Sequence, residues 1–169
     1  MTFTDKNILK KLKGVRLVIT DVDGVLTDGG LYYSAEGLVM KKFNVKDGMG
    51  TKLLSDIGIE TGIITTDGET SDLIKKRAER LKLSFLYTGI WDKEIKLKEI
   101  CTEKKISLEN VAFIGDDVND LSIINDVGVS FAPSDAAADV RDAVDVVLSK
   151  KGGEGAFREL ADLIIKAQM

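Results

Sequence analysis

Short apolar runs alternate with amphipathic segments along most of the chain, and this alternation limits the fold more than any other feature. Runs rich in Val, Ile, Leu and Phe predict buried strands, while the segments between them place apolar residues at helical spacing. The expected strands are 15–20, 60–65, 84–89, 110–115, 127–132 and 143–149, and the expected helices are 47–57, 69–83, 92–106, a short one around 121–124 and the segment from 153 onward. Such alternation is typical of a parallel sheet covered by helices on both faces. We therefore predict an α/β fold, a three-layer doubly wound parallel sheet.

One segment departs from this pattern. Residues 30–45 hold two extended stretches separated by turn residues at 34–37, which predicts a protruding β-hairpin. There is no internal repeat and no linker, and Pro133 is the only proline. We expect a single domain over 1–169, with a C-terminal tail at about 149–169.

Composition excludes several classes of function. The chain has no histidine, which rules out Ser-His-Asp and Cys-His nucleophiles and His-ligated zinc. Its net charge of −4 argues against a nucleic-acid partner. Cys101 is the only cysteine, so no intramolecular disulfide forms, which fits a reducing cytoplasm. No stretch is long and apolar enough for a membrane span, and the lysine-rich residues 1–16 are not expected to be a secretory signal.

Polar residues gather at the predicted carboxyl ends of the strands, where open α/β sheets bind their ligands. They are Asp21 and Asp23, Thr65 and Thr66, and Asp116 and Asp117, while Lys93 begins a helix. An Asp after a strand is commonly only a turn former or a helix cap. A second acidic group in "GDDVND", with Asp120 one helical turn on, favours a hard cation instead, Mg²⁺ before Ca²⁺.

With Mg²⁺, a lysine and a threonine hydroxyl suit a phosphoryl group. Neither an EF-hand loop nor a GxxxxGK[ST] loop is present, so a calcium loop and a P-loop nucleotidase are both excluded. A carboxylate nucleophile, as in aspartyl-phosphate enzymes, fits better.

Four segments in order, "DVDGVLTD", "IITT", "DK" and "GDDVND", resemble the motifs of the haloacid dehalogenase (HAD) superfamily of phosphatases. The stretches "DGVLTDGGLYY", "KKFNVKDGMG" and "KKGGEGAFRE" are similar to the small phosphatases that act on 3-deoxy-2-ulosonic acid phosphates, typified by the 3-deoxy-D-manno-octulosonate (KDO) 8-phosphate phosphatase family. The resemblance implies a HAD-like, Rossmann-type fold without a cap domain. It also implies a cytoplasmic, Mg²⁺-dependent homotetramer that dephosphorylates a sugar acid in lipopolysaccharide biosynthesis.

The resemblance also implies roles for single residues. Asp21 would be the nucleophile and a metal ligand, and Asp23 the general acid and base, with its carbonyl facing the metal. The other implied roles are phosphate binding for Thr65 and Lys93, a direct metal contact for Asp116, and outer-shell orientation for Asp117 and Asp120. Thr66 follows Thr65 where the family has Gly or Ser, and the loop after it is about two residues longer, so either threonine could bind phosphate. Asp28 is expected to cap the hairpin.

A site without a cap is wet unless something covers it. Leu31, Tyr33, Leu38 and Met40 of the hairpin predict either a satellite core or an oligomer interface. We expect residues 150–155 to reach over a neighbouring subunit's site, the alternative being a flexible connector.

Substrate contacts are expected from Lys46, Asp47, Glu69, Arg77 and Arg80, although each is also consistent with an exposed helix charge. The resemblance predicts KDO 8-phosphate as the substrate. Glu69 falls where octulosonate phosphatases tend to carry a basic residue and nonulosonate phosphatases a Glu, so a nonulosonate (KDN or sialic acid) 9-phosphate is the alternative. Two alternatives from other classes are a phospho-accepting receiver-type signalling domain and a non-catalytic assembly subunit that has kept the fold.

Overall fold

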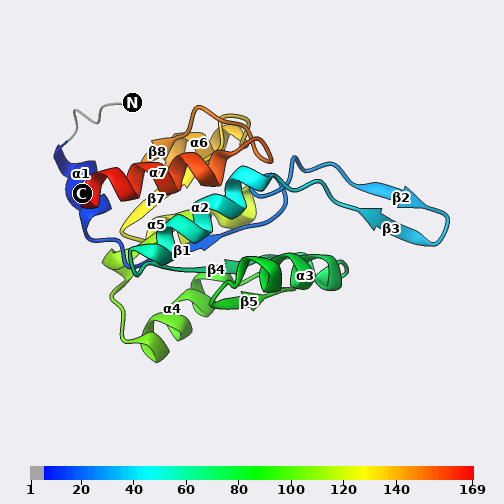
Figure 1. Cartoon of the computed structure of the whole chain (residues 1–169), viewed down its shortest axis with the longest axis horizontal. Coiled ribbons are helices and arrows are strands. Elements are labelled where there is room, and N and C mark those ends of the chain that lie inside the picture. The colour runs from blue at the N-terminus through cyan, green and yellow to red at the C-terminus, as the bar shows by residue number, and fades with distance from the viewer. Residues whose placement is uncertain (1–5) are drawn as a thin grey trace.

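The computed structural model describes residues 6–169 and centres on a six-stranded sheet in the order β5-β4-β1-β6-β7-β8 (Figure 1). Every neighbouring pair in this sheet is parallel. The strands are β1 Leu17–Thr20, β4 Glu60–Ile64, β5 Phe85–Tyr87, β6 Val111–Ile114, β7 Val129–Ala132 and β8 Val146–Val147. The predicted parallel α/β sheet is confirmed.

Side chains of the central strands alternate between two apolar layers. In β1, Val18 packs into one hydrophobic cluster, while Leu17 and Ile19 pack into the other. The first cluster is covered by α1 Lys6–Lys13, α2 Val45–Asp56, α3 Ser71–Leu81 and α7 Ala156–Gln168, and the second by α4 Lys93–Lys104, α5 Leu121–Asp126 and α6 Ala138–Ala143. Because both faces are buried, the strands appear in the sequence as unbroken apolar runs.

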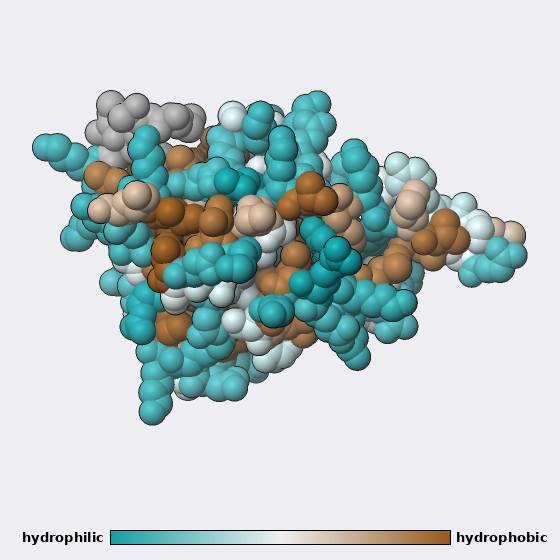
Figure 2. Space-filling model, in the orientation of Figure 1, coloured by the Kyte–Doolittle hydropathy of each residue, from teal (hydrophilic) through white to brown (hydrophobic). Residues whose placement is uncertain are grey.

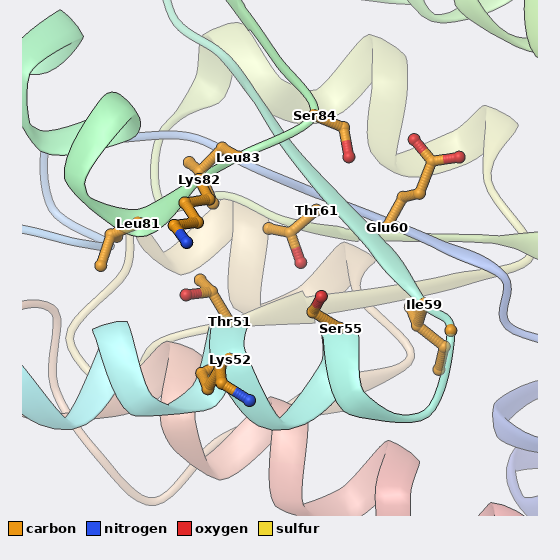
Figure 3. Close-up of a pocket in the computed structure, with 11 residues that line it drawn as sticks. Thr51, Lys52, Ser55, Ile59, Glu60, Thr61, Leu81, Lys82, Leu83 and Ser84 are labelled. Carbon is orange, nitrogen blue, oxygen red and sulfur yellow. The ribbon is translucent and has the colours of Figure 1, made fainter.

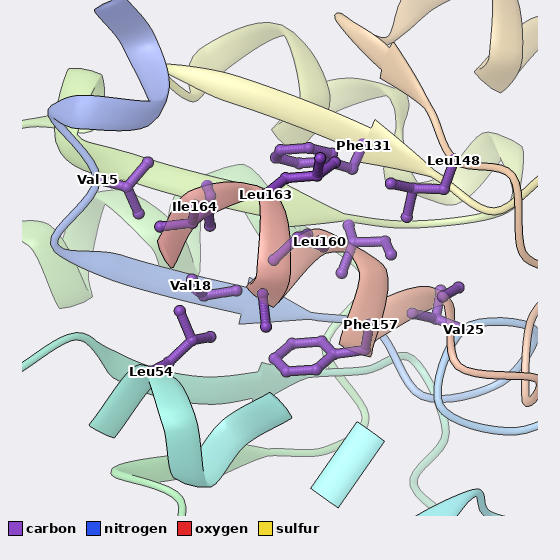
Figure 4. Close-up of a cluster of buried hydrophobic side chains, with 14 of the residues drawn as sticks. Val15, Val18, Val25, Leu54, Phe131, Leu148, Phe157, Leu160, Leu163 and Ile164 are labelled. Carbon is purple, nitrogen blue, oxygen red and sulfur yellow. The ribbon is translucent and has the colours of Figure 1, made fainter. Parts of the chain in front are cut away.

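The C-terminal helix provides much of the first layer. Phe157, Leu160 and Ile164 of α7 are fully buried and lie at helical spacing. Figure 4 shows them in one cluster with Val18 of β1 and Leu54 of α2. The last helix therefore holds the sheet against α2, the helix that follows the hairpin.

The hairpin is an antiparallel pair, β2 Tyr32–Ser34 and β3 Gly37–Met40, that projects away from the sheet as predicted (Figure 1). At its base the Asp28 carboxylate accepts a hydrogen bond from Gly30 N and pairs with Lys42 at 3.0 Å. An isolated β-bridge between Thr27 and Phe43 joins the segments that enter and leave the hairpin. Asp28 thus stabilises the hairpin base, as expected.

Two helices, α1 and α6, were not among the predicted elements. In α1, Ile8 and Leu12 lie four residues apart and are buried. Five of its eight residues are polar, namely four lysines and one asparagine. The apolar stripe is too narrow to stand out in so charged a segment, so the helix depends on its packing against the sheet and α7.

Residues 150–155 were predicted to reach over a neighbouring subunit's site, and that reach stays a prediction, but within the chain the segment is anchored at its glycines. Gly152 and Gly153 are buried in their own chain, where Gly153 N donates to Val25 O and Asn44 Nδ2 donates to Gly153 O, each at 3.0 Å. A Cβ on Gly152 would lie 1.9 Å from Gly24 O. The segment therefore supports the loop after β1 from within the same chain, and it is not a flexible connector.

Asp47 joins α2 to α7. Its Oδ1 accepts a hydrogen bond from Arg158 N at 2.9 Å, satisfying a free N–H in the first turn of α7. Its Oδ2 is buried without a hydrogen-bond partner among the described residues. Burial raises the pKa of Asp47 to about 6, opposed by the hydrogen bond from Arg158 and the charge of Arg77.

We expect Asp47→Asn to change how stability depends on pH. The pKa is 3.8 in the unfolded chain and about 6 in the folded one, so the stabilising contribution of Asp47 is complete below pH 4 and is lost as pH rises through 6. Between pH 4.5 and pH 7, the free energy of unfolding should shift in favour of the Asn variant by roughly 1 to 3 kcal/mol. Urea unfolding at both pH values measures this, with Asp56→Asn as an exposed control on α2. A pH-independent gap between Asp47→Asn and the natural protein would contradict the assignment.

Candidate active site

Register brings Asp21 and the loop that carries Asp116 together at the carboxyl edge of the sheet. Thr20, the last residue of β1, pairs with Ile63 of β4 and Ile114 of β6. The next residue, Asp21, donates its N–H to Ile114 O at 3.0 Å. Asp21 therefore lies beside the loop that carries Asp116, as the motif spacing predicts.

Lys93 connects two of the carboxylates. Its Nζ lies 3.0 Å from Asp21 Oδ1 and 2.5 Å from Asp120 Oδ1. The side chain is fully buried, at the first position of α4. The cost of burying this ammonium group is offset because two carboxylates from distant parts of the chain pair with it.

The charges in this group oppose one another. Burial raises the pKa of Asp21 to about 6, while the nearby Lys93 ammonium acts in the opposite direction and Asp120 adds to the increase. Burial alone would lower the pKa of Lys93, but Asp21 and Asp120 outweigh burial and raise it. Lys93 therefore stays a cation and favours the ionised form of Asp21 that a nucleophile requires.

Asp116 adds a third carboxylate that lacks a matching charge. Carboxylate oxygens of Asp21, Asp116 and Asp120 all lie within 4.8 Å of one another. Burial, followed by repulsion from Asp21 and the neighbouring acids, raises the pKa of Asp116 to about 8, against the opposing effect of Lys93. Oxygen donors with excess negative charge are what Mg²⁺ prefers, so the group fits a divalent ion.

Asp120 is already committed to other donors. Its Oδ1 faces Lys93, and its Oδ2 accepts the Asp116 N–H at 2.9 Å. Asp117 accepts the Val118 N–H at 2.7 Å and caps the short helical turn Val118–Asp120. These contacts fit the outer-shell roles predicted for Asp117 and Asp120. Those roles, and the direct metal contacts predicted for Asp21 and Asp116, stay predictions.

The backbone after Asp23 approaches the same group closely. Gly24 has φ +78°, and a Cβ there would lie 1.9 Å from Asp116 Oδ2. Only glycine fits both this conformation and this distance. The chain at 23–24 is thus held against Asp116, consistent with the prediction that the Asp23 carbonyl faces the metal.

Two residues around Asp23 were not predicted. Thr27 Oγ1 donates to Asp23 Oδ1 at 3.2 Å, and Lys41 Nζ lies 2.6 Å from Asp23 Oδ2. Lys41 also pairs with Asp67, in the loop after β4. The Lys41–Lys42 pair gives no signal of which lysine faces inward, so only the folded hairpin distinguishes them.

The predicted phosphate-binding threonines follow β4. Thr65 is 1% exposed, and its hydroxyl accepts a hydrogen bond from Asp67 N at 3.3 Å. Thr66 is half-buried in the same loop. Both threonines follow β4, the strand next to β1. Either hydroxyl therefore stays a prediction for the phosphate contact.

The expected substrate contacts differ in their environments. Asp47 is 2% exposed beneath α7, which argues against the substrate contact expected of it. Arg77 is half-buried, donates to Asn44 O at 2.9 Å and lies over the Phe43 ring. Lys46, Glu69 and Arg80 are exposed, which is compatible both with a substrate contact and with a plain surface charge.

A separate cavity of about 210 Å³ lies at the opposite end of β4 (Figure 3). It is lined by Thr61 of β4, Ser55 of α2 and the segment 81–84, among others. Because Glu60 and Thr61 begin β4 and Thr65 follows its end, this cavity is distinct from the acidic site.

The fold and the site together define a carboxylate-based, metal-dependent hydrolase. A family model described as haloacid dehalogenase-like hydrolase matches residues 62–160, more than half of the chain. In residues 6–169 no helix has the length and apolar character to cross a bilayer.

Curated and solved relatives agree with this class. The 3-deoxy-D-manno-octulosonate 8-phosphate phosphatase of Haemophilus influenzae is 42% identical over 94% of this chain and 87% of its own. A cobalt-bound structure of that enzyme aligns with TM-score 0.89 and 41% identity, over 94% of this chain and 91% of the other. The Moraxella catarrhalis phosphatase, in complex with magnesium, phosphate and KDO, aligns with TM-score 0.92 and 36% identity, over 97% and 94%. The chain belongs to the haloacid dehalogenase-like hydrolases, in the family of the KDO 8-phosphate phosphatases.

We expect Mg²⁺ to stabilise the protein through Asp116. At a hundredfold excess over its Kd, the ion should add about 2.7 kcal/mol to the free energy of unfolding. Asp116→Asn should lose this gain and be more stable than the natural protein in EDTA, because a repelled carboxylate is removed. Thermal unfolding with EDTA and with Mg²⁺ measures both effects, with Asp56→Asn as the surface control. An undiminished gain in Asp116→Asn would contradict the proposed ligand.

Proposed function

We propose that the protein hydrolyses KDO 8-phosphate to KDO and phosphate with Mg²⁺, through an aspartyl-phosphate intermediate. One observation carries the proposal: the Moraxella relative holds magnesium, phosphate and KDO, which are the metal and both products of this reaction. The site geometry supports it, because a nucleophile, a cation and an acidic group lie together at the carboxyl edge of the sheet.

In the first half-reaction, Asp21 attacks phosphorus and the bond to the sugar oxygen breaks. Lys93 supports the ionised Asp21 from 3.0 Å and balances the charge of the incoming phosphoryl group. Asp23 gives its proton to the departing sugar oxygen, so the sugar leaves as a neutral alcohol. Thr65 or Thr66 donates to the phosphoryl oxygens.

In the second half-reaction, Asp23, now a carboxylate, takes a proton from water. The water oxygen attacks phosphorus, and the bond to Asp21 breaks to release phosphate. Asp21, the Asp23 carbonyl and Asp116 would hold Mg²⁺, with Asp117 and Asp120 supporting from outside. The ion supplies positive charge and fixes the orientation of the phosphoryl group.

A nine-carbon substrate remains the second candidate. Glu69 is exposed two residues before α3, and Lys46 and Arg80 are exposed as well, so all three are accessible to a larger sugar acid. The identity to octulosonate phosphatases favours the eight-carbon acid. The family assignment removes the receiver-domain alternative.

We expect Mg²⁺-dependent phosphate release to be greatest with KDO 8-phosphate in a panel that includes KDN 9-phosphate, sialic acid 9-phosphate and hexose phosphates. Asp21→Asn should reduce turnover by at least about 10³-fold, since the covalent step is lost. Asp139→Asn, an exposed aspartate of α6, serves as the matched control. Preference for a nine-carbon ester would move the assignment to the second candidate, and equal rates on all esters would overturn substrate specificity.

We also propose that the protein is a homo-oligomer, a tetramer assembled through the hairpin. Tyr33 is 64% exposed, and Leu31 and Met40 are each about half exposed on the projecting arm (Figure 2). Apolar side chains on a two-stranded arm have no layer of their own to pack against, which favours burial by another subunit. A cytoplasmic location and a role in lipopolysaccharide biosynthesis belong to the same proposal.

Tyr33→Asp should lower the molar mass measured by light scattering after size exclusion, because a charge then faces the interface. Ile57→Asp, at a 45% exposed apolar residue after α2, is the matched control and should leave the mass unchanged. Equal masses for Tyr33→Asp and the natural protein would argue against the hairpin interface.

A further inference from the structure

Lys41 lies at the base of the hairpin, in the short link between β3 and the Thr27–Phe43 bridge. Its side chain is only 1% exposed, whereas that of its neighbour Lys42 is 57% exposed. The hairpin therefore turns one lysine of the pair into the protein and leaves the other at the surface.

The ammonium of Lys41 lies between two carboxylates from different loops. It is 2.6 Å from Asp23 Oδ2, in the loop after β1, and it also pairs with Asp67, in the loop after β4. Asp67 is fixed in turn, because its Oδ1 accepts the Thr70 N–H at 2.9 Å and its Oδ2 accepts the Thr70 hydroxyl. Lys41 is thus held at a defined position by an anchored partner.

Both oxygens of Asp23 are restrained as a result. Thr27 donates to Oδ1 from one side, and Lys41 holds Oδ2 from the other. A carboxyl group that exchanges a proton with a leaving oxygen works only within a narrow range of distance and angle. The Asp23 side chain is 33% exposed, and an ion pair that water reaches adds little to stability, so stability alone does not account for a lysine here.

We propose that Lys41, anchored by Asp67, is a positioning residue that aims the Asp23 carboxyl at the leaving oxygen. This inference rests on the proposed phosphatase function, in which Asp23 serves the leaving group. Lys41 acts through Asp23 and is not required for the attack of Asp21 on phosphorus.

Substrates with different leaving groups can distinguish a role in positioning Asp23 from a role in metal binding, phosphate binding or folding. A sugar alkoxide is a poor leaving group and needs the proton from Asp23, whereas p-nitrophenolate departs readily as an anion. Loss of aim at Asp23 should therefore slow hydrolysis of a sugar phosphate and spare hydrolysis of p-nitrophenyl phosphate. A defect in metal binding, phosphate binding or folding would slow both.

The test measures kcat and KM of purified variants with saturating Mg²⁺ on KDO 8-phosphate and on p-nitrophenyl phosphate. Lys41→Met should lower kcat on the sugar phosphate by about 10²-fold, in the range of general acid catalysis, and on the aryl phosphate by less than about threefold. Lys41→Arg should restore at least about tenfold of that loss. Lys42→Met, which removes the adjacent exposed lysine, should match the natural protein on both esters.

Asp67→Asn supplies a second, independent variant. It removes the anchor but keeps Lys41, so we expect the same split between the two esters at about tenfold. If Lys41→Met does not fold, as judged by a missing thermal transition, Asp67→Asn and Lys41→Arg decide the question. Equal losses on both esters, or no loss on either, would overturn the positioning role.

These outcomes are distinct from failure of the proposed function. A natural protein that hydrolyses p-nitrophenyl phosphate and a hexose phosphate but no sugar-acid phosphate would overturn the proposed substrate. The leaving-group split would then be measured with that hexose phosphate. A natural protein that hydrolyses no ester would overturn both proposals.

Discussion

The interaction on which the site depends is the contact of one fully buried lysine with two carboxylates. Lys93 meets Asp21 and Asp120, which lie 72 and 27 residues away in the sequence. Each of the three charges would be costly to bury alone, and together they leave an excess of negative charge once Asp116 is added. The excess is what makes the place suitable for a divalent cation, and the cation and the lysine together make it suitable for phosphate. A fold that kept the sheet but moved α4 by a turn would leave the acids with no internal counter-charge.

The parallel sheet explains why this part of the site could be predicted from the sequence. In parallel strands, residues that directly follow the apolar runs must meet at one edge, whatever the rest of the chain does. Asp21 and Asp116 obey this rule, since they follow β1 and β6, which are neighbours in register. Thr65 follows β4 on the other side of β1, and Lys93 opens the helix after β5. Strand ends carry the prediction, so errors of one or two residues in strand length did not affect it.

Residues whose partners come from outside the sheet could not be found in this way. Asp47 has the sequence context of an exposed acid in the first turn of a helix, and its burial depends on α7, which returns across α2 more than a hundred residues later. Gly152 and Gly153 have the composition of a flexible connector, and only their contact with the loop at 24–28 requires glycine. Lys41 is one of two adjacent lysines in a segment with no helical or strand periodicity of its own. In all three cases a long-range contact determines the role of the residue, and the local sequence pattern does not predict that contact.

The hairpin connects the strand-end site to a contact from outside the sheet. Its arm carries the exposed apolar residues, while its base sets which lysine faces Asp23. The register at the base is fixed on one side by the β2–β3 pairing, which ends at Met40, and on the other by the Thr27–Phe43 bridge. A slip of one residue in this link would place either Met40 or Lys42 where Lys41 now lies, because neighbouring side chains of an extended chain point to opposite sides. Lys42 pairs with Asp28 at the surface, on the opposite side of the chain from the buried Lys41. An element that looks like an appendage to the sheet is therefore part of the geometry around Asp23.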